Sequence, residues 1–315
     1  MRILVTEPMQ AAARERLAAE HEVDYRPGLF ESPDALLAAA PSADALVVAN
    51  RTPVRGALLE ALQRCRAVGR LGVGLDNIDV PGCEARGIAV LPATGANARS
   101  VAEYVITCLL LLRRPGSFTA TAGVAAGAWP RPPARLGDEA AGATLGVVGF
   151  GAIGQLTARL ARGLGLQVLA HARRTPPDLD PALCDVPLLP LAELLTRCDV
   201  LSLHLPLTDA TRGLIGAAEI ARMKPGAVLI NTARGAIVDG AAVVEALRRG
   251  HLRGAALDVF DTEPLPADSV FADPPPGLLL SPHVGSSTVQ SEARVSERVA
   301  DRLLHHLAGG PASRG

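Results

Sequence analysis

The chain has 315 residues and a formal net charge of −1 at pH 7, and 49% of its residues are hydrophobic, which suffices for a sizeable core in one large or, more readily, two domains. The near balance of acidic and basic residues argues against nucleic acid or an anionic membrane surface as a partner. Five widely spaced cysteines without a C-x-x-C motif indicate free thiols in a reducing compartment. Because neither a signal peptide nor a membrane-length apolar run of ~20 residues is found, we expect a cytoplasmic protein.

The first hundred residues alternate short apolar runs with helical patterns. Strands are predicted at 3–5, 22–25, 45–48, 67–69 and 88–91, and helices at 9–19, near 32–40 and through Leu58, Leu59 and Leu62. Such alternation predicts a parallel sheet covered by helices on both faces. The capping-box sequence from Ser100 to Glu103 predicts that a long helix begins at Ser100 and leads into a second domain. Residues 115–142, which include the single tryptophan Trp129, are rich in Gly, Pro and Ala and predict a short helix and a surface loop.

A glycine-rich turn organises the second half of the chain. The predicted strand 145–148 leads directly into Gly149-Phe150-Gly151-Ala152-Ile153-Gly154, and a helical pattern with Leu156, Leu160 and Leu164 on one face connects it to a strand at 167–171. The glycines permit a tight turn, close approach of a pyrophosphate and close packing of the helix, whose free amides attract phosphate. The unit predicts a dinucleotide site with cofactor contacts at Gly149, Gly151, Ala152, Ile153 and Gly154. A purely structural glycine turn is the alternative.

The residues after the second strand of this unit bear on the choice of cofactor. An NAD site usually has an acidic residue about 20 residues beyond the glycines, which binds the ribose 2′-hydroxyl, whereas arginine suits the 2′-phosphate of NADP. Here Ala172, Arg173 and Arg174 follow His171, and the first carboxylate is that of Asp178. We therefore favour NADP(H), with NAD(H) as the alternative if both arginines only face solvent.

Three later strands are followed by residues able to perform chemistry. Strands are predicted at 200–205, 228–231, 255–259 and 278–280, and the carboxyl ends of such strands form the rim where a doubly wound sheet binds its ligand. Arg234, Glu263 and His283 follow the last three. Arginine binds a carboxylate bidentately, histidine exchanges a proton, and glutamate orients the imidazole and stabilises its charged form. Taken singly, each is more often an ion-pair, turn or loop residue.

Together these segments resemble the D-isomer-specific 2-hydroxyacid dehydrogenase family over nearly the whole chain. The resemblance rests on the stretch 72–79 (Gly-Val-Gly-Leu-Asp-Asn-Ile-Asp), on Ser100–Glu103, on the glycine turn, on His204-Leu205-Pro206, and on the Arg, Glu and His segments, which occur in the family's order. It implies an α/β fold of two doubly wound parallel-sheet domains. A Rossmann dinucleotide-binding domain (100–284) is then inserted into a flavodoxin-like substrate domain (1–99 and 285–315), which ends in a helix from Gln290 to Leu307.

The resemblance also implies an activity and the residues that carry it. The activity is reversible hydride transfer between a nicotinamide cofactor and a small 2-hydroxy or 2-oxo acid, held in the cleft between the domains. Arg234 would bind the substrate carboxylate together with the backbone of Val73 and Gly74, His283 would be the general acid/base, and Glu263 its partner. Further substrate contacts are expected from Asn50, Arg51 and Asn97, with Asn50 and Arg51 suited to an acidic substituent. The remaining cofactor contacts are expected at His204, Leu205, Pro206, Thr232, Ala233, Asp258 and Gly285, and Arg234 and His283 also face the cofactor.

Several alternatives stay open at this point. The missing acidic residue after His171 matches the family's NADP-using glyoxylate and hydroxypyruvate reductases, which we favour, whereas stretches 50–52, 70–77 and 92–97 look most like the sulfolactate dehydrogenase branch. A phosphoglycerate dehydrogenase-like activity is a further possibility. The Glu263–His283 pair argues against a formate-type dehydrogenase. A cofactor-sensing corepressor shares this fold, but no long disordered arm or basic patch supports it. We expect a homodimer and no metal site.

Overall fold

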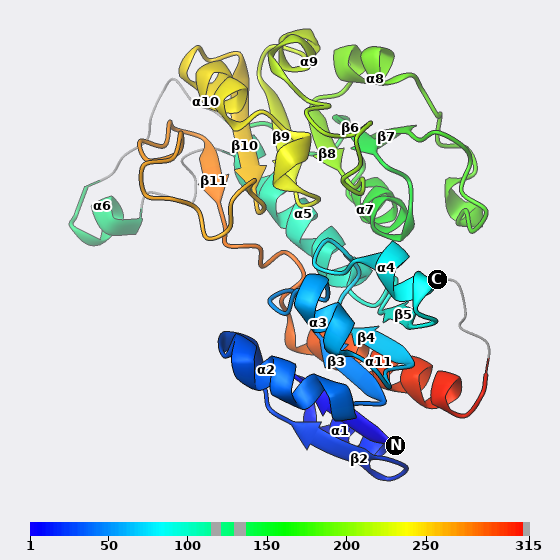
Figure 1. The fold of residues 1–315 in the computed structure, drawn as a ribbon. Coiled ribbons are helices and arrows are strands. Elements are labelled where there is room, and N and C mark those ends of the chain that lie inside the picture. Colours follow the sequence, from blue (N-terminus) through cyan, green and yellow to red (C-terminus); the bar gives the residue numbers. More distant parts are fainter. Residues whose placement is uncertain (115–120, 129–136, 311–315) are drawn as a thin grey trace. The chain divides into compact units, whose positions relative to one another are not determined.

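The computed structural model describes residues 1–114, 121–128 and 137–310. The chain forms two compact units, one made of Met1–Asn97 and Ser287–Gly315, the other of Ala98–Ser286. Each contains one sheet whose strands all pair in parallel, with helices on both faces (Figure 1). The family's two-domain parallel α/β fold is thus confirmed.

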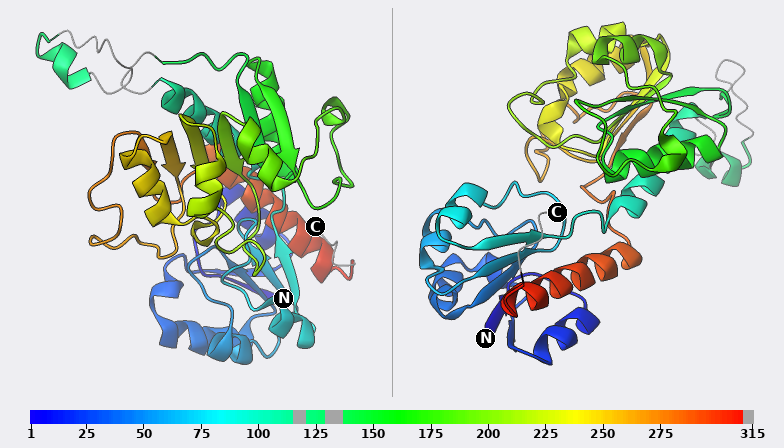
Figure 2. Two further views of the ribbon diagram at one scale, coloured as in Figure 1. Left: turned by 90° about the horizontal axis from the view of Figure 1, so that it is seen from above. Right: turned by 90° about the vertical axis from the view of Figure 1, so that its right-hand side faces the viewer.

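The first unit has a five-stranded sheet in the order β2-β1-β3-β4-β5. Its strands are β1 (Arg2–Val5), β2 (Glu22–Tyr25), β3 (Ala45–Val48), β4 (Ala67–Arg70) and β5 (Ala89–Pro92). Helices α1 (Ala11–Ala18) and α11 (Val289–Leu307) pack on one face, and α2 (Pro33–Ala39), α3 (Gly56–Ala61) and α4 (Val80–Ala85) on the other, with short turns η1 (Leu29–Glu31) and η2 (Ala40–Ser42) between them. Figure 2 shows α11, in red, lying along this sheet.

The predicted last helix is confirmed, and the sequence explains where it docks. A Cβ at Gly69 would lie only 2.7 Å from Val299 Cγ1 and 2.9 Å from Leu303 Cδ1. Because Gly69 of β4 has no side chain, α11 packs close to the sheet, and Val299 and Leu303 are fully buried there.

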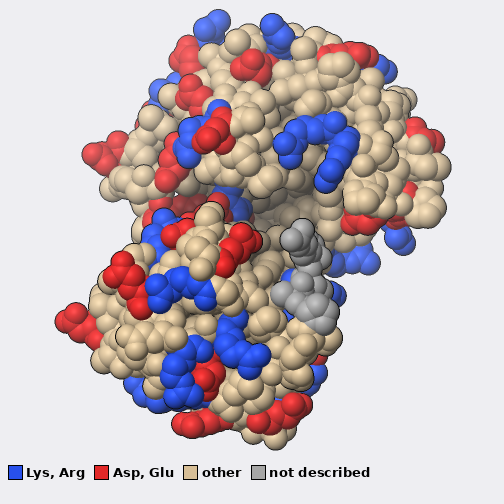
Figure 3. Space-filling model, turned by 45° about the vertical axis from the view of Figure 1, so that its right-hand side comes forward, with Lys and Arg blue, Asp and Glu red and all other residues tan. Residues whose placement is uncertain are grey.

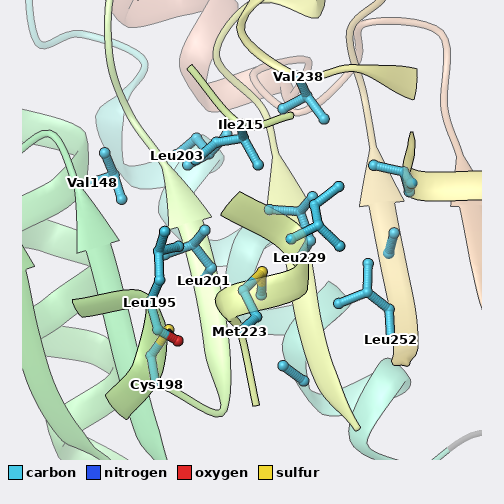
Figure 4. Close-up of a cluster of buried hydrophobic side chains, with 14 of the residues drawn as sticks. Val148, Leu195, Cys198, Leu201, Leu203, Ile215, Met223, Leu229, Val238 and Leu252 are labelled. Carbon is cyan, nitrogen blue, oxygen red and sulfur yellow. Dashed lines mark hydrogen bonds between the residues drawn. The ribbon is translucent and has the colours of Figure 1, made fainter. Parts of the chain in front are cut away.

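The second unit has a six-stranded sheet in the order β11-β10-β9-β8-β6-β7. Its strands are β6 (Thr144–Val148), β7 (Gln167–His171), β8 (Val200–Leu203), β9 (Ala227–Asn231), β10 (Leu252–Leu257) and β11 (Leu278–Leu280). One face is covered by α5 (Ala98–Arg113), α7 (Ala152–Gly163) and η3 (Pro181–Leu183), the other by α8 (Leu191–Arg197), α9 (Ala217–Arg222) and α10 (Gly240–Arg248); η4 (Gly235–Ile237) and α6 (Thr121–Ala125) complete the unit. Figure 4 shows part of the hydrophobic core between this sheet and helices α8, α9 and α10, in which Leu201, Leu229 and Met223 lie together.

This strand order places a switch point beside β6. The chain runs from β6 outward to β7 on one side and then returns to β8 on the other. In doubly wound sheets the ligand crevice opens at the carboxyl ends of the strands at such a point. The glycine turn, which follows β6, therefore lies where the fold binds ligands.

Two helices differ in detail from the sequence predictions. Helix α5 begins at Ala98 and not at Ser100, and Ser100 is buried inside it, because Ala98 and Arg99 are themselves strong helix formers. The predicted leucine face of α7 is confirmed only in part: Leu156 and Leu160 are half-buried, whereas Leu164 is the C-cap residue and is 40% exposed.

Helix α7 instead buries its small residues. Gly154, Thr157, Ala158 and Ala161 face the sheet and α5. A Cβ at Gly154 would lie 2.1 Å from the Gly149 carbonyl oxygen, so the helix approaches the turn too closely for larger side chains. Trp129, in the predicted loop, lies outside the described residues.

On the face in Figure 3, acidic and basic side chains occur side by side on both units. Within the described ranges, no helix is both long and apolar enough to cross a membrane, and no three His, Cys, Asp or Glu side chains gather in a way that could hold a metal ion.

Candidate active site

The turn between β6 and α7 is an open cradle of backbone amides. Gly149 has φ +96°, and a Cβ there would lie 2.4 Å from the His204 carbonyl oxygen, so only glycine fits. A Cβ at Gly151, in contrast, would find no atom within 4 Å. The amides of Gly151, Ala152 and Ile153 have no acceptor among the described residues. Free amides at the start of a 12-residue helix, with open space before them, fit the pyrophosphate of a dinucleotide.

The other predicted cofactor residues of this part lie at the ends of β7 and β8. Arg173 and Arg174 are exposed after β7, next to the partly buried Ala172, and neither makes a hydrogen bond or ion pair with a described residue. His204 follows β8, and its Nε2 lies 3.0 Å from Ser202 Oγ. Burial lowers the pKa of His204 to about 4, so its imidazole is neutral near pH 7.

Leu205 and Pro206 complete this group of residues. Leu205 Cδ2 lies 3.0 Å from the position of a Cβ at Gly149, so the segment after β8 packs directly on the glycine turn. Pro206 is exposed. Residues 149–154, 172–174 and 204–206 therefore gather at the carboxyl ends of β6, β7 and β8, which are neighbours in the sheet.

The segment after β9 is held by a buried amide side chain. Asn231, 1% exposed, accepts the Ala233 N–H at Oδ1 (3.0 Å) and donates from Nδ2 to the Arg234 carbonyl (2.9 Å). The Arg234 guanidinium donates from Nη1 to the Ala233 carbonyl at 2.5 Å. Thr232 Oγ1 is buried with no partner among the described residues, and such a group can bind a polar atom of a ligand.

Glycine also brings the segments after β9 and β10 into contact. A Cβ at Gly235 would lie 2.0 Å from the carbonyl carbon of Phe260 and 2.4 Å from the Asp261 nitrogen. The residue after Arg234 therefore touches the backbone that leads to Glu263.

Glu263 and His283, predicted as a pair, are hydrogen-bonded. His283 Nδ1 lies 2.8 Å from Glu263 Oε2, and Glu263 Oε1 accepts the Phe260 N–H at 2.9 Å. The His283 side chain is 39% exposed, and its Nε2 has no partner among the described residues. Because Nδ1 faces an acceptor, Nε2 is the nitrogen available to exchange a proton with a ligand.

Asp258, predicted to contact the nicotinamide, holds the segment that carries His283. It is 2% exposed; Oδ1 accepts from the Val284 N–H (2.9 Å) and the Ser281 hydroxyl (2.5 Å), and Oδ2 accepts from the Gly285 N–H (2.7 Å). The predicted contact with the cofactor stays a prediction.

In the first unit, a buried carboxylate shapes the loop that contains Asn50 and Arg51. Glu7, 2% exposed, accepts the N–H groups of Ala49 (2.8 Å) and Thr52 (2.9 Å) at Oε1 and that of Arg51 (3.1 Å) at Oε2. The side chains of Asn50 and Arg51 are exposed, and the Arg51 guanidinium carbon lies 5.1 Å from the centre of the Phe30 ring.

The loop after β4, with Val73 and Gly74, joins the same framework. Asn77 Nδ2 donates to the carbonyls of Ala49 (2.9 Å) and Thr52 (2.7 Å), so the loops after β3 and β4 are tied together. Arg70 Nε donates to the Gly74 carbonyl at 2.9 Å. Asn97, at the end of this segment of the unit, has a buried Oδ1 without a partner in the described ranges.

The sequence interpretation missed the buried groups that support the predicted residues. Glu7 and Asn231 had one available cue, since each stands at or just beyond the end of a strand. The Tyr104 hydroxyl lies 2.5 Å from Ser281 Oγ, but 177 residues separate the two and no local pattern connects them.

Comparisons with known proteins show the family of the chain. The family model for the D-isomer specific 2-hydroxyacid dehydrogenase NAD binding domain matches residues 106–285. An (S)-sulfolactate dehydrogenase of Chromohalobacter salexigens is 48% identical over 306 residues, 97% of this chain and 98% of that protein. A hydroxypyruvate reductase of Thermotoga maritima is 35% identical over 309 residues, 97% of this chain and 98% of that protein. A crystal structure of a Thermus thermophilus protein, 36% identical, matches with a TM-score of 0.89 over 100% of this chain and 99% of its own.

Proposed function

Since this chain belongs to the D-isomer specific 2-hydroxyacid dehydrogenase family, we propose that its substrate is a 2-hydroxy acid with a second anionic group, sulfolactate first among them. The 48% identity to a sulfolactate dehydrogenase over nearly the full length of both chains supports this choice. Arg51, exposed on a loop held by Glu7, supplies a cation for the second anion. Hydroxypyruvate, the substrate named for the 35% identical relative, is the second candidate.

The hydrogen bond between His283 Nδ1 and Glu263 Oε2, with Nε2 left available, is the observation that carries the proposed chemistry. A nicotinamide cofactor held at the glycine turn would supply or accept a hydride at C2 of the substrate. In the reducing direction His283 donates the Nε2 proton to the C2 oxygen, and in the oxidising direction it removes that proton. Glu263 fixes the ring and stabilises its charged form. Arg234 binds the substrate carboxylate, aided by backbone amides near Val73 and Gly74.

The proton-transfer role predicts a large loss on removing the imidazole. His283→Ala should lower kcat by ~100-fold or more, the usual contribution of a positioned acid/base. His305→Ala, which removes an exposed histidine of α11, is the matched control and should keep the wild-type rate. A folded His283→Ala protein with wild-type kcat would disprove the assignment.

Substrate choice is tested by comparing 2-oxo acids with and without a second anion. We expect the highest kcat/KM with sulfopyruvate, ahead of hydroxypyruvate, glyoxylate and pyruvate. Arg51→Ala should raise KM for sulfopyruvate by ~10-fold or more, the effect of losing a hydrogen bond between charged groups. Glyoxylate has no second anion, so its KM should not change. A preference for hydroxypyruvate or glyoxylate in the wild type would favour a reductase instead.

For the cofactor we propose NADP(H), bound through its 2′-phosphate by Arg173 and Arg174. Their exposure at the end of β7, the lack of an ion pair with any described residue, and the absence of a carboxylate there support it. Replacing both by alanine should raise KM for NADPH by ~10-fold or more and leave KM for NADH unchanged. Arg197→Ala, which removes an exposed arginine of α8, is the control. Equal use of NADH and NADPH by the wild type would contradict the proposal, and cofactor binding without turnover would favour a corepressor.

We also infer that the first unit binds the acid and the second the cofactor, and that the protein is a cytoplasmic homodimer. The match of the NAD binding domain model to 106–285 supports the first inference. The free cysteines fit a reducing compartment. The interface we propose consists of α5 and residues 115–142. Leu110 on α5 is 39% exposed, and Val124, which lies within 115–142 on α6, is 46% exposed. Light scattering on the purified protein measures the mass of the assembly; a monomer would contradict the proposal.

A further inference from the structure

His283 has a backbone conformation that its surroundings must impose. Its φ is +56°, and no other non-glycine residue in the described ranges has a positive φ. Histidine adopts this left-handed region uncommonly, and such conformations persist where neighbouring groups fix them. Here the His283 N–H donates to the Asp258 carbonyl at 2.8 Å, and the next two amides donate to the Asp258 carboxylate. The direction of the imidazole therefore depends on the position of Asp258.

Two hydroxyl groups, of which one contacts Asp258 directly, extend the hydrogen bonds of this carboxylate. Ser281 Oγ lies 2.5 Å from Asp258 Oδ1, and Tyr104 Oη lies 2.5 Å from Ser281 Oγ. Because the carboxylate oxygens act as acceptors for two amides, the Ser281 hydroxyl donates to Asp258. Ser281 Oγ then accepts from Tyr104, so the three groups form one directed chain of hydrogen bonds.

The Tyr104 ring is also fitted to this segment. A Cβ at Gly285 would lie 2.9 Å from Asp258 Oδ2 and 3.6 Å from Tyr104 Cδ1, so the ring and the carboxylate both pack on Gly285. Burial raises the pKa of Tyr104 to about 12, and the phenol keeps the proton that it donates. Tyr104 comes from α5.

We propose that Tyr104 is a positioning residue for His283, which it fixes through Ser281 and Asp258. The inference rests on the proposed role of His283 as the proton donor. Glu263 sets the ring through its Nδ1, whereas the Tyr104–Ser281–Asp258 chain sets the backbone from which the ring projects. Without the Tyr104 hydroxyl, the segment that carries His283 can move. The imidazole then spends less time with Nε2 in the orientation needed for proton transfer.

Three substitutions test this chain one atom group at a time. Tyr104→Phe removes the hydroxyl and keeps the ring, Ser281→Ala removes the link, and Ser281→Thr keeps a hydroxyl in its place. Tyr25→Phe, at the only other tyrosine, is the matched control. The measurements are kcat, both KM values and Tm, with sulfopyruvate or whichever of the four 2-oxo acids is turned over fastest.

We expect Tyr104→Phe to lower kcat by ~3- to 30-fold, less than the ~100-fold that a 1 Å misplacement of a catalytic group can produce, with both KM values unchanged. Ser281→Thr should retain most of the rate that Ser281→Ala loses. The Tyr104→Phe/Ser281→Ala double variant should be no slower than Ser281→Ala alone, because the two residues act in series. Tyr25→Phe should match the wild type.

Wild-type kcat in Tyr104→Phe, or a double variant whose effects multiply, would overturn the proposal. If Ser281→Ala does not fold, Tyr104→Phe and Ser281→Thr still decide the question. His283→Ala separates the two levels of inference. Its full activity would remove the proton-transfer role itself, whereas its inactivity beside a fully active Tyr104→Phe would remove only the positioning role.

Discussion

Gly235 is the position at which the smallest change should disturb both stability and catalysis. In Gly235→Ala the new Cβ would lie 2.0 Å from the Phe260 carbonyl carbon and 2.4 Å from the Asp261 nitrogen. Ordinary contact begins at 3.4 Å, so one backbone segment has to move by about 1.4 Å. Both segments are main chain and cannot turn aside as a side chain would. We therefore expect the free energy of unfolding to fall by about 3 kcal/mol, the upper end for overpacking.

The same displacement reaches the proposed proton donor. Glu263 Oε1 accepts the Phe260 N–H, and Glu263 Oε2 accepts from His283, so movement of Phe260 carries the pair with it. A shift of this size should lower kcat by ~10- to 100-fold. Urea denaturation followed by circular dichroism gives the stability, and initial rates give kcat. Gly163→Ala, at the end of α7 with no atom within 4 Å, should instead stabilise by about 0.5 kcal/mol at the wild-type rate. Wild-type values for Gly235→Ala would refute this reasoning.

Three further outcomes follow from buried groups. Only Cys184 is exposed, and burial raises the pKa of Cys198 to about 12, so a thiol reagent should modify one cysteine per native chain and all five after unfolding; fast reaction of more than one in the native protein would contradict this. Burial lowers the pKa of His204 from 6.5 to about 4, so the stability linked to its neutral form is complete above pH 6.5 and is lost as the pH falls toward 4; urea denaturation between these values should show a loss of at most about 3 kcal/mol that His204→Asn reduces. Glu7→Gln puts an amide donor against a backbone N–H and should reduce the free energy of unfolding by about 1–3 kcal/mol, whereas no change would show that the loop does not need the carboxylate.

Most of the fold follows from local patterns, and the failures have a common cause. Short apolar runs predicted most strands of both sheets, because strands buried on both faces are continuous hydrophobic stretches, as in Ala45–Val48, which is wholly buried. The leucine periodicity of α7 does not indicate that Gly154, Ala158 and Ala161 are among the buried residues of this helix. Its orientation is decided by how closely Gly154 approaches the Gly149 carbonyl. That distance depends on the tertiary packing of the turn and cannot be predicted from the sequence of the helix alone.

In the candidate site, too, some contacts follow from the sequence and others depend on tertiary packing. The rule that parallel strands carry ligands at their carboxyl ends predicted that Glu263 and His283 would share a rim, and they are hydrogen-bonded. The groups beneath them could not be predicted. Nothing near Tyr104 in the sequence indicates Ser281 as its partner, since that contact exists only once α5 has packed beside β10.

The two units hold their exposed polar side chains by the same physical device. In one, the Glu7 carboxylate accepts three backbone amides of the loop that presents Arg51; in the other, Asp258 accepts two amides of the segment that presents His283. Each carboxylate is 2% exposed and binds main chain, so the shape of the loop does not depend on the exposed side chain. A substitution at Arg51 should therefore change which acid is bound without changing the loop. The left-handed backbone of His283 imposes the opposite constraint, because the proposed proton donor itself occupies the conformation that Asp258 enforces. If the proposed roles hold, substitutions at the first loop should change the acid that is bound while the geometry of the second loop stays fixed.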